Sequence, residues 1–166
     1  FGQNQNFDTV RFGTELSLQV EPPESRVRGR LAYAFVDAEF RKGTFKEQTI
    51  PGTPAHLLTT SIGVSPLGGL WVDMAWQLVN GFFRVNDFNN QLGGADNYGV
   101  LNLLARYDIP RWRDEAVWPD VSLYGRIENL TNEEYSAYQS SIGTSVSAGE
   151  APAPPIGVYG GVEMRF

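Results

Sequence analysis

Apolar and polar residues alternate with a period of two along most of this chain. In the segment 10–20, for example, Phe12, Leu16 and Leu18 fall at even positions and Arg11 at an odd one. Successive side chains of a β-strand point to opposite faces, so this pattern predicts a strand with one apolar face. The same alternation occurs in the segments 10–20, 27–35, 58–64, 70–78, 98–109, 121–128 and 156–166. None of these segments has helical periodicity, and we therefore predict an all-β, antiparallel fold of about seven strands.

The charged residues of these segments all fall on the face opposite the apolar one. They include Arg11, Glu15, Arg28, Arg30, Asp73, Arg106, Arg126, Glu128, Glu163 and Arg165. Two architectures have this pattern. In a soluble β-sandwich the apolar faces pack together and the charged faces meet water. In a membrane β-barrel the apolar face meets lipid and the charged face lines a wet interior. Periodicity alone does not choose between them.

The connections between the strands favour the barrel. They alternate between short ones, near 21–25, 65–69 and 110–120, and long, apparently structureless ones at 41–55, 80–97 and 129–155. Outer-membrane barrels have short periplasmic turns and long external loops, and their strands span the membrane with about 9–11 residues. A compact soluble domain seldom carries several long loops.

The strand count and the loop lengths also predict an orientation. The last strand runs from a long loop to the C-terminus, which places the C-terminus on the periplasmic side. Complete bacterial barrel chains normally have an even number of strands. Seven strands therefore predict that residues 1–166 are the C-terminal piece of a larger barrel. The missing strands would come from chain before Phe1 or from a separate chain.

Composition excludes several other kinds of protein. The chain has no cysteine, which excludes disulfides and thiolate metal sites. It has no apolar run long enough for a transmembrane helix. A net charge of −6 argues against a nucleic-acid partner. No motif points to a resident cofactor or metal, so none is expected.

The C-terminal octapeptide 159–166 combines glycine with alternating large residues and ends on an aromatic ring. It resembles the β-signal by which the barrel-assembly machinery recognises outer-membrane proteins. The positions that carry this resemblance are Tyr159, Gly161, Met164 and Phe166.

A second resemblance lies in the segment 127–135. Asn129, Leu130, Asn132 and Tyr135 are similar to the motif that ends the penultimate strand of TonB-dependent receptors. Upstream, the segments 50–57 and 97–102 resemble a loop exit and a strand entry of the same family. The order and spacing of these matches fit the last third of such a receptor, and they span nearly the whole chain.

This resemblance implies a membrane barrel of about 22 strands that encloses a plug. It implies uptake of a scarce ligand, a ferric siderophore, across the bacterial outer membrane, and no enzymatic activity. The implied partners are the plug and the rest of the barrel, the TonB complex, the barrel-assembly machinery and outer-membrane lipid, with no nucleic acid. The plug domain and the TonB box, through which the TonB complex would bind, are absent from residues 1–166.

Ligand recognition in such a receptor is expected on the external loops. The candidates are aromatic, charged and imidazole side chains, namely Phe82, Phe83, Arg84, Asp87, Phe88, Tyr135, Tyr138 and His56. Arg41, Lys42 and Lys46 could attract an anionic chelate. For each of these residues, a place in an interfacial aromatic belt or a solvated loop is an equally good interpretation.

Three other functions stay open at this level. The chain could be a structural subunit of a membrane assembly, or a soluble β-sandwich that binds a ligand. An outer-membrane lipase would need a nucleophile near His56, the only histidine, and the sequence has no G-x-S-x-G motif to supply one.

Overall fold

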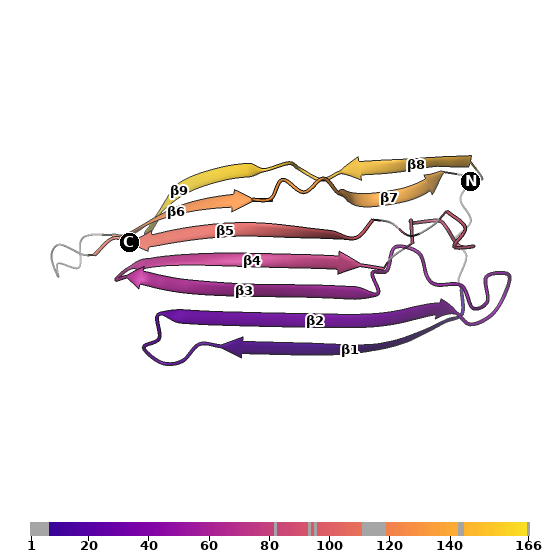
Figure 1. Cartoon of the computed structure of the whole chain (residues 1–166), viewed down its shortest axis with the longest axis horizontal. Coiled ribbons are helices and arrows are strands. Elements are labelled where there is room, and N and C mark those ends of the chain that lie inside the picture. Colours follow the sequence, from indigo (N-terminus) through magenta and orange to yellow (C-terminus); the bar gives the residue numbers. More distant parts are fainter. Residues whose placement is uncertain are drawn as a thin grey trace.

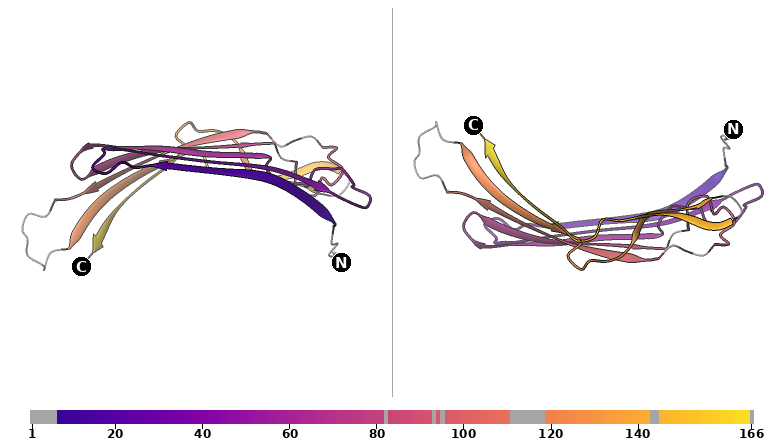
Figure 2. Two further views of the ribbon diagram at one scale, coloured as in Figure 1. Left: turned by 90° about the horizontal axis from the view of Figure 1, so that it is seen from below. Right: turned by 90° about the horizontal axis from the view of Figure 1, so that it is seen from above.

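In the computed structural model the chain forms one curved antiparallel sheet and a separate hairpin (Figures 1 and 2). The structure describes residues 7–81, 83–92, 94, 96–110, 119–142 and 145–165, without the side chains of 137–150. Its strands are β1 (Thr9–Val20), β2 (Val27–Phe40), β3 (His56–Leu67), β4 (Leu70–Asn80), β5 (Tyr98–Asp108), β6 (Asp120–Glu128), β7 (Ser136–Ile142), β8 (Ser145–Pro152) and β9 (Gly157–Arg165). The described residues include no helix, and thus none that could cross a membrane.

The seven predicted strands are confirmed, and each pairs with its neighbour in the order β1-β2-β3-β4-β5-β6-β9. Of these strands, β2, β3 and β4 extend two or more residues beyond the segments in which the sequence alternates. β2 continues to Phe40, because Thr9 pairs with Phe40 at the start of β1. β3 and β4 meet at a tight turn in which Gly69 adopts a φ of 80°, a conformation that glycine reaches without strain.

The long connection 129–155 differs from the prediction, because it is not structureless. It contains the hairpin β7–β8, which forms a two-stranded sheet of its own between β6 and β9 (Figure 1). The sequence 136–152 is rich in serine, alanine and glycine and has no clear apolar alternation. Without that alternation, the sequence pattern gave no indication of these two strands.

The register joins the apolar sides of all seven strands into one surface, here called the apolar face. Met74 of β4 lies opposite Ile62 of β3 and Leu103 of β5, and Ile127 of β6 lies opposite Val158 of β9. The charged positions share the other surface, here called the polar face. Large apolar side chains are strongly exposed on the apolar face, with 69% exposure for Phe12 and 74% for Val158.

Two charged residues interrupt the predicted charge-free apolar face. In the part of β2 beyond Phe35, Asp37 lies opposite Phe12 and Glu39 lies opposite Val10. Both carboxylates are therefore on the apolar side of the sheet. They follow Phe35 at the end of the sheet where the connections 41–55, 81–97 and 129–156 gather, here called the loop end (Figure 1). The apolar surface of β2 therefore stops at Phe35.

The sheet is open at both edges. Within the described part of the chain, β1 pairs only with β2 and β9 only with β6. The views along the sheet show it curved like a section of a wall rather than closed on itself (Figure 2). An open edge leaves backbone N–H and C=O groups available for another strand.

Candidate functional site

At the loop end, the connections 41–55 and 81–97 are packed against each other by one asparagine. The Thr49 N–H donates to Asn90 Oδ1 at 2.7 Å, and Asn90 Nδ2 donates to the Thr49 carbonyl at 3.0 Å. Asn90 thus satisfies both backbone groups of Thr49, as a neighbouring strand would do. The loops form a single packed unit rather than two separate segments.

Asp87, a predicted ligand contact, is engaged inside this unit. Its side chain is only 5% exposed. Its two carboxylate oxygens accept hydrogen bonds from the backbone N–H groups of Gln91 and Leu92, both at 3.0 Å. Its ligand role stays a prediction, but the carboxylate has a structural function here, which is to close the turn that follows it.

Replacing Asp87 by alanine should loosen the loop 81–97. The change leaves two backbone N–H groups without their acceptor, a loss of about 1–3 kcal/mol for a buried group. Hydrogen exchange at Gln91 and Leu92 in the whole receptor should become much faster. Asp96→Ala is the matched control, because Asp96 is exposed. Equal exchange in both variants would contradict the structural role of Asp87.

Phe88, another candidate, lies in an aromatic cluster. Its ring contacts Phe45, Phe7 and Phe40 at centroid distances of 5.3, 5.5 and 6.0 Å. Phe40 is only 3% exposed and joins this cluster to the end of β2. The structure therefore places Phe88 in the packing of the loop unit.

Tyr135 stacks on Tyr98 at the start of β5, with ring centroids 4.3 Å apart and planes 23° apart. Tyr98 pairs with Val79 and so lies on the polar face. An aromatic pair at this position can stack against a flat ligand group. Tyr135, one of the predicted ligand contacts, is thus a half-buried ring at the loop end, on the polar side.

His56 begins β3 and lies on the apolar face. Tyr33 Oη and His56 Nδ1 are hydrogen-bonded at 2.8 Å, and the Phe35 ring lies 5.2 Å from the imidazole. Tyr33 and Phe35 share that face by their register with β1. The ligand contact predicted for His56 stays a prediction. In the structure its side chain packs with the rings of Tyr33 and Phe35 on the apolar face.

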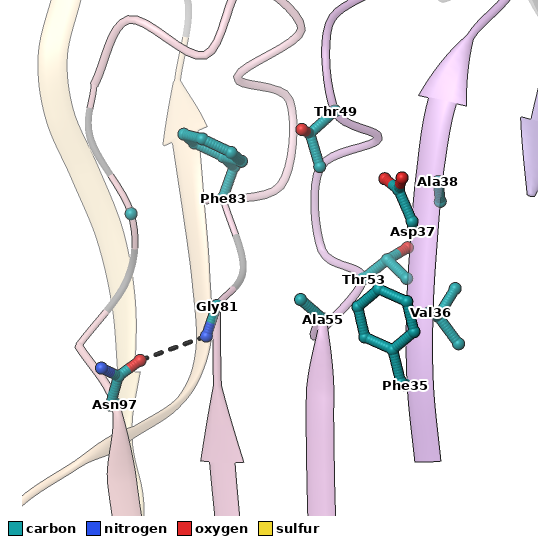
Figure 3. Close-up of a pocket in the computed structure, with 11 residues that line it drawn as sticks. Phe35, Val36, Asp37, Ala38, Thr49, Thr53, Ala55, Gly81, Phe83 and Asn97 are labelled. Carbon is teal, nitrogen blue, oxygen red and sulfur yellow. Dashed lines mark hydrogen bonds between the residues drawn. The ribbon is translucent and has the colours of Figure 1, made fainter. Parts of the chain in front are cut away.

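A cavity of about 400 Å³ lies beside this group, between β2 and the segments 49–55 and 81–97 (Figure 3). Asp37 and Thr53 lie side by side on one wall, and Phe35 and Phe83 flank the space (Figure 3). The residues predicted from the sequence do not include Asp37, Thr49 or Thr53. The sequence does mark Asp37, because it lies two residues after Phe35. In a strand it therefore shares the side of Phe35 and places a charge on an otherwise apolar side.

On the polar face, the charged residues pair across strands near the opposite end of the sheet. Arg28 forms a two-pronged contact with Asp73, at 2.9 and 2.7 Å, and its guanidinium lies 4.3 Å from the centre of the Trp71 ring. Arg106 of β5 contacts Glu163 of β9 at 2.8 Å across the intervening strand. These contacts pair charged side chains of the polar face with one another.

The Arg106 cluster connects three strands. Arg106 also donates to Asp108 at 2.9 Å and to Ser122 of β6 at 2.8 Å. Arg165 donates to Glu163 at 3.0 Å. Planar guanidinium groups suit such multiple contacts with carboxylates. The last strand is therefore fastened to β5 through side chains as well as to β6 through its backbone.

The basic residues predicted to attract an anionic chelate, Arg41, Lys42 and Lys46, are partly neutralised by ion pairs. Lys42 pairs with Asp8 at 3.1 Å and Lys46 with Glu47 at 2.9 Å, all on exposed side chains. These ion pairs lower the positive field that the three basic residues would otherwise produce. Attraction of an anionic chelate by this segment stays a prediction.

Comparison with protein families now identifies the chain. Residues 2–130 match the family model described as TonB dependent receptor-like, beta-barrel. The chain belongs to this family. The resemblance found in the sequence is confirmed, and so is the all-β barrel-segment fold. A comparison with curated proteins finds no match.

Solved structures of TonB-dependent receptors share the fold. The ferric citrate transporter FecA in its unliganded form matches with a TM-score of 0.75 and 19% identity, over 95% of this chain and 24% of that one. The siderophore receptor PiuA from Acinetobacter baumannii gives 0.77 and 17%, over 95% and 22%. The copper transporter OprC gives 0.70 and 18%, over 97% and 24%. The chain thus spans about a quarter of these relatives.

The segment after β6 that resembles a TonB-dependent receptor motif has a definite physical role in the structure. Asn129 adopts a positive φ of 52°. Its Oδ1 accepts from the Glu133 N–H at 2.8 Å, and its Nδ2 donates to the Glu133 carbonyl at 2.9 Å. The Leu130 N–H donates to the Leu101 carbonyl at 2.7 Å, and Asn132 Oδ1 accepts from the Ile156 N–H at 3.1 Å. The motif directs the chain out of β6 and back toward β9.

The residues that resemble an assembly signal lie on both faces of β9. Gly161 lies opposite Tyr124, and a Cβ atom at Gly161 would overlap the Tyr124 ring. Tyr159 lies opposite Arg126 on the polar face, whereas Met164 is exposed on the apolar face. Recognition by the assembly machinery stays a prediction. Phe82, Phe166 and the side chain of Tyr138 lie outside the described residues.

Proposed function

We propose that this chain is the C-terminal section of the barrel wall of a bacterial outer-membrane receptor. In this proposal the apolar face meets lipid and the polar face lines the interior. The observation that carries the proposal is the apolar face itself, which continues over all seven strands with large side chains strongly exposed. A soluble protein rarely leaves so large an apolar surface in water.

The same proposal includes an orientation of the sheet relative to the outer membrane. The loop end is external, and the C-terminus lies on the periplasmic side. The free edges of β1 and β9 pair with strands from the remainder of the barrel, because an open edge in lipid leaves costly unpaired backbone. The plug fills the interior against the polar face, and the TonB complex acts through the plug-bearing part of the receptor.

For the whole receptor we propose uptake of a ferric siderophore. Support comes from two structural relatives, a ferric citrate transporter and a siderophore receptor. The loop end adds the stacked rings of Tyr98 and Tyr135, which suit the flat groups of an iron chelate. The likeness to a copper transporter makes uptake of a copper complex the second candidate.

Transport by the whole receptor tests these alternatives. A strain that lacks its other siderophore receptors should take up radioactive iron from a ferric siderophore panel only when this receptor and TonB are both present. Tyr135→Ala should weaken uptake, whereas Glu24→Ala, in the short β1–β2 turn, should not. TonB-dependent uptake of copper but not iron would replace the siderophore with the second candidate. Uptake of neither would overturn the transport proposal.

A further inference from the structure

If the sheet is part of a barrel wall, the height of the loop-end cavity relative to the membrane can be inferred from the residues of β2. On β2, apolar and aromatic side chains of the apolar face end at Tyr33 and Phe35, with His56 beside them. The next residue of that face is Asp37. In membrane barrels, aromatic rings mark the interface and charges on the lipid side begin beyond it. The cavity therefore lies at the height of the outer-leaflet headgroups, an assignment that rests on the proposed function.

The walls of the cavity are fixed by backbone hydrogen bonds. The Val36 N–H donates to the Ala55 carbonyl at 2.9 Å, and the Ala55 N–H donates to the Gly81 carbonyl at 2.8 Å. The Gly52 N–H donates to the Phe83 carbonyl at 2.8 Å. Thr49 is held by Asn90. The space is thus already formed, and its volume of about 400 Å³ lies within the range of small-molecule sites.

The polar groups of the cavity both accept and donate hydrogen bonds. Asp37 is exposed and forms no hydrogen bond or ion pair with any side chain in the described ranges. Its carboxylate can accept hydrogen bonds only. Thr49 and Thr53 add two hydroxyl groups, each of which can donate and accept. Phe35 and Phe83 supply flat apolar surfaces beside these groups (Figure 3).

These features select one class of ligand. The negative charge of Asp37 disfavours phosphate and carboxylate groups. An ammonium group would satisfy Asp37, but it has no acceptor for the threonine hydroxyls. Sugar hydroxyls both donate and accept, and the C–H faces of a sugar ring are apolar enough to lie on an aromatic ring. We propose that this cavity binds a neutral sugar ring in the headgroup of an outer-leaflet glycolipid.

The test uses the whole receptor in lipid nanodiscs that contain a synthetic glucosyl diacylglycerol. After extraction, native mass spectrometry counts the glycolipid molecules retained by each receptor. Asp37→Ala and Thr53→Val should each reduce retention about tenfold, the usual effect of losing a hydrogen bond to a charged or well-placed partner. Glu39→Ala is the control, because it removes the same charge from the same face outside the cavity.

Several outcomes would overturn this inference. Equal retention by Asp37→Ala, Thr53→Val and Glu39→Ala would exclude the cavity as the site. Equal binding of free methyl glucoside would show that a soluble sugar, not a glycolipid, is the ligand. Competition by tetramethylammonium but not by methyl glucoside would replace the sugar with an organic cation. Siderophore uptake is measured separately, so that the two proposals can fail independently. Retention of glycolipid without uptake would overturn the transport proposal and leave the glycolipid inference in place.

Discussion

Replacing Leu103 by arginine is expected to lower the free energy of unfolding of the whole receptor by about 2–4 kcal/mol. Leu103 lies at the middle of β5, opposite Met74 and Ile127 on the apolar face. If that face meets lipid, the guanidinium is buried near the centre of the bilayer, where no water hydrates it. The effect is among the largest that a single position on the apolar face of this sheet can give.

The measurement is urea unfolding of the receptor folded into lipid vesicles. Gln77→Arg is the matched control, because Gln77 is exposed near the middle of neighbouring β4 but lies on the polar face. It should change the free energy of unfolding by much less. Glu163 would be a poor control, since it accepts hydrogen bonds from Arg106 and Arg165. Equal losses for Leu103→Arg and Gln77→Arg would contradict the assignment of the faces.

Replacing Asn129 by alanine is expected to cost about 2–4 kcal/mol. Asn129 is only 3% exposed, and its side chain bonds both backbone groups of Glu133 and, at 3.3 Å, the Pro154 carbonyl. Alanine leaves these groups without partners. It also tolerates the left-handed backbone conformation less well than asparagine does.

Two further variants separate these causes. Asn129→Gly relieves the backbone conformation but restores no hydrogen bond, so it should remain clearly less stable than the wild type in the same unfolding assay. Asn129→Asp keeps an acceptor for the Glu133 N–H but sets a buried carboxylate oxygen against the Glu133 and Pro154 carbonyl oxygens, so it should be no more stable than Asn129→Gly. Wild-type stability of Asn129→Gly would show that the hydrogen bonds contribute little.

The strands and their faces could be predicted because they depend on local periodicity. A strand that meets lipid on one side and water on the other must alternate, and a slip of one residue would exchange the faces. This is why the register agrees with the alternation from Leu16 on β1 to Val158 on β9. The same parity rule would have placed His56 on the apolar face, two residues before Leu58.

The loop end could not be predicted in the same way. Asp87 and Phe88 were chosen for their chemistry, whereas their roles depend on which groups the folded chain brings to them. Asn90 bonds Thr49, 41 residues away, and no local pattern encodes that pair. The hairpin β7–β8 was missed because its serine, alanine and glycine residues give no periodic apolar signal.

The loops 41–55 and 81–97 depend on each other through the Asn90–Thr49 pair and the rings of Phe40, Phe45 and Phe88. A chimera that receives only 81–97 from another receptor would leave the Thr49 N–H and carbonyl without their partner. It would also remove one ring from the cluster. For engineering of ligand specificity, the two loops together with the end of β2 are therefore one module, and they should be exchanged as a set.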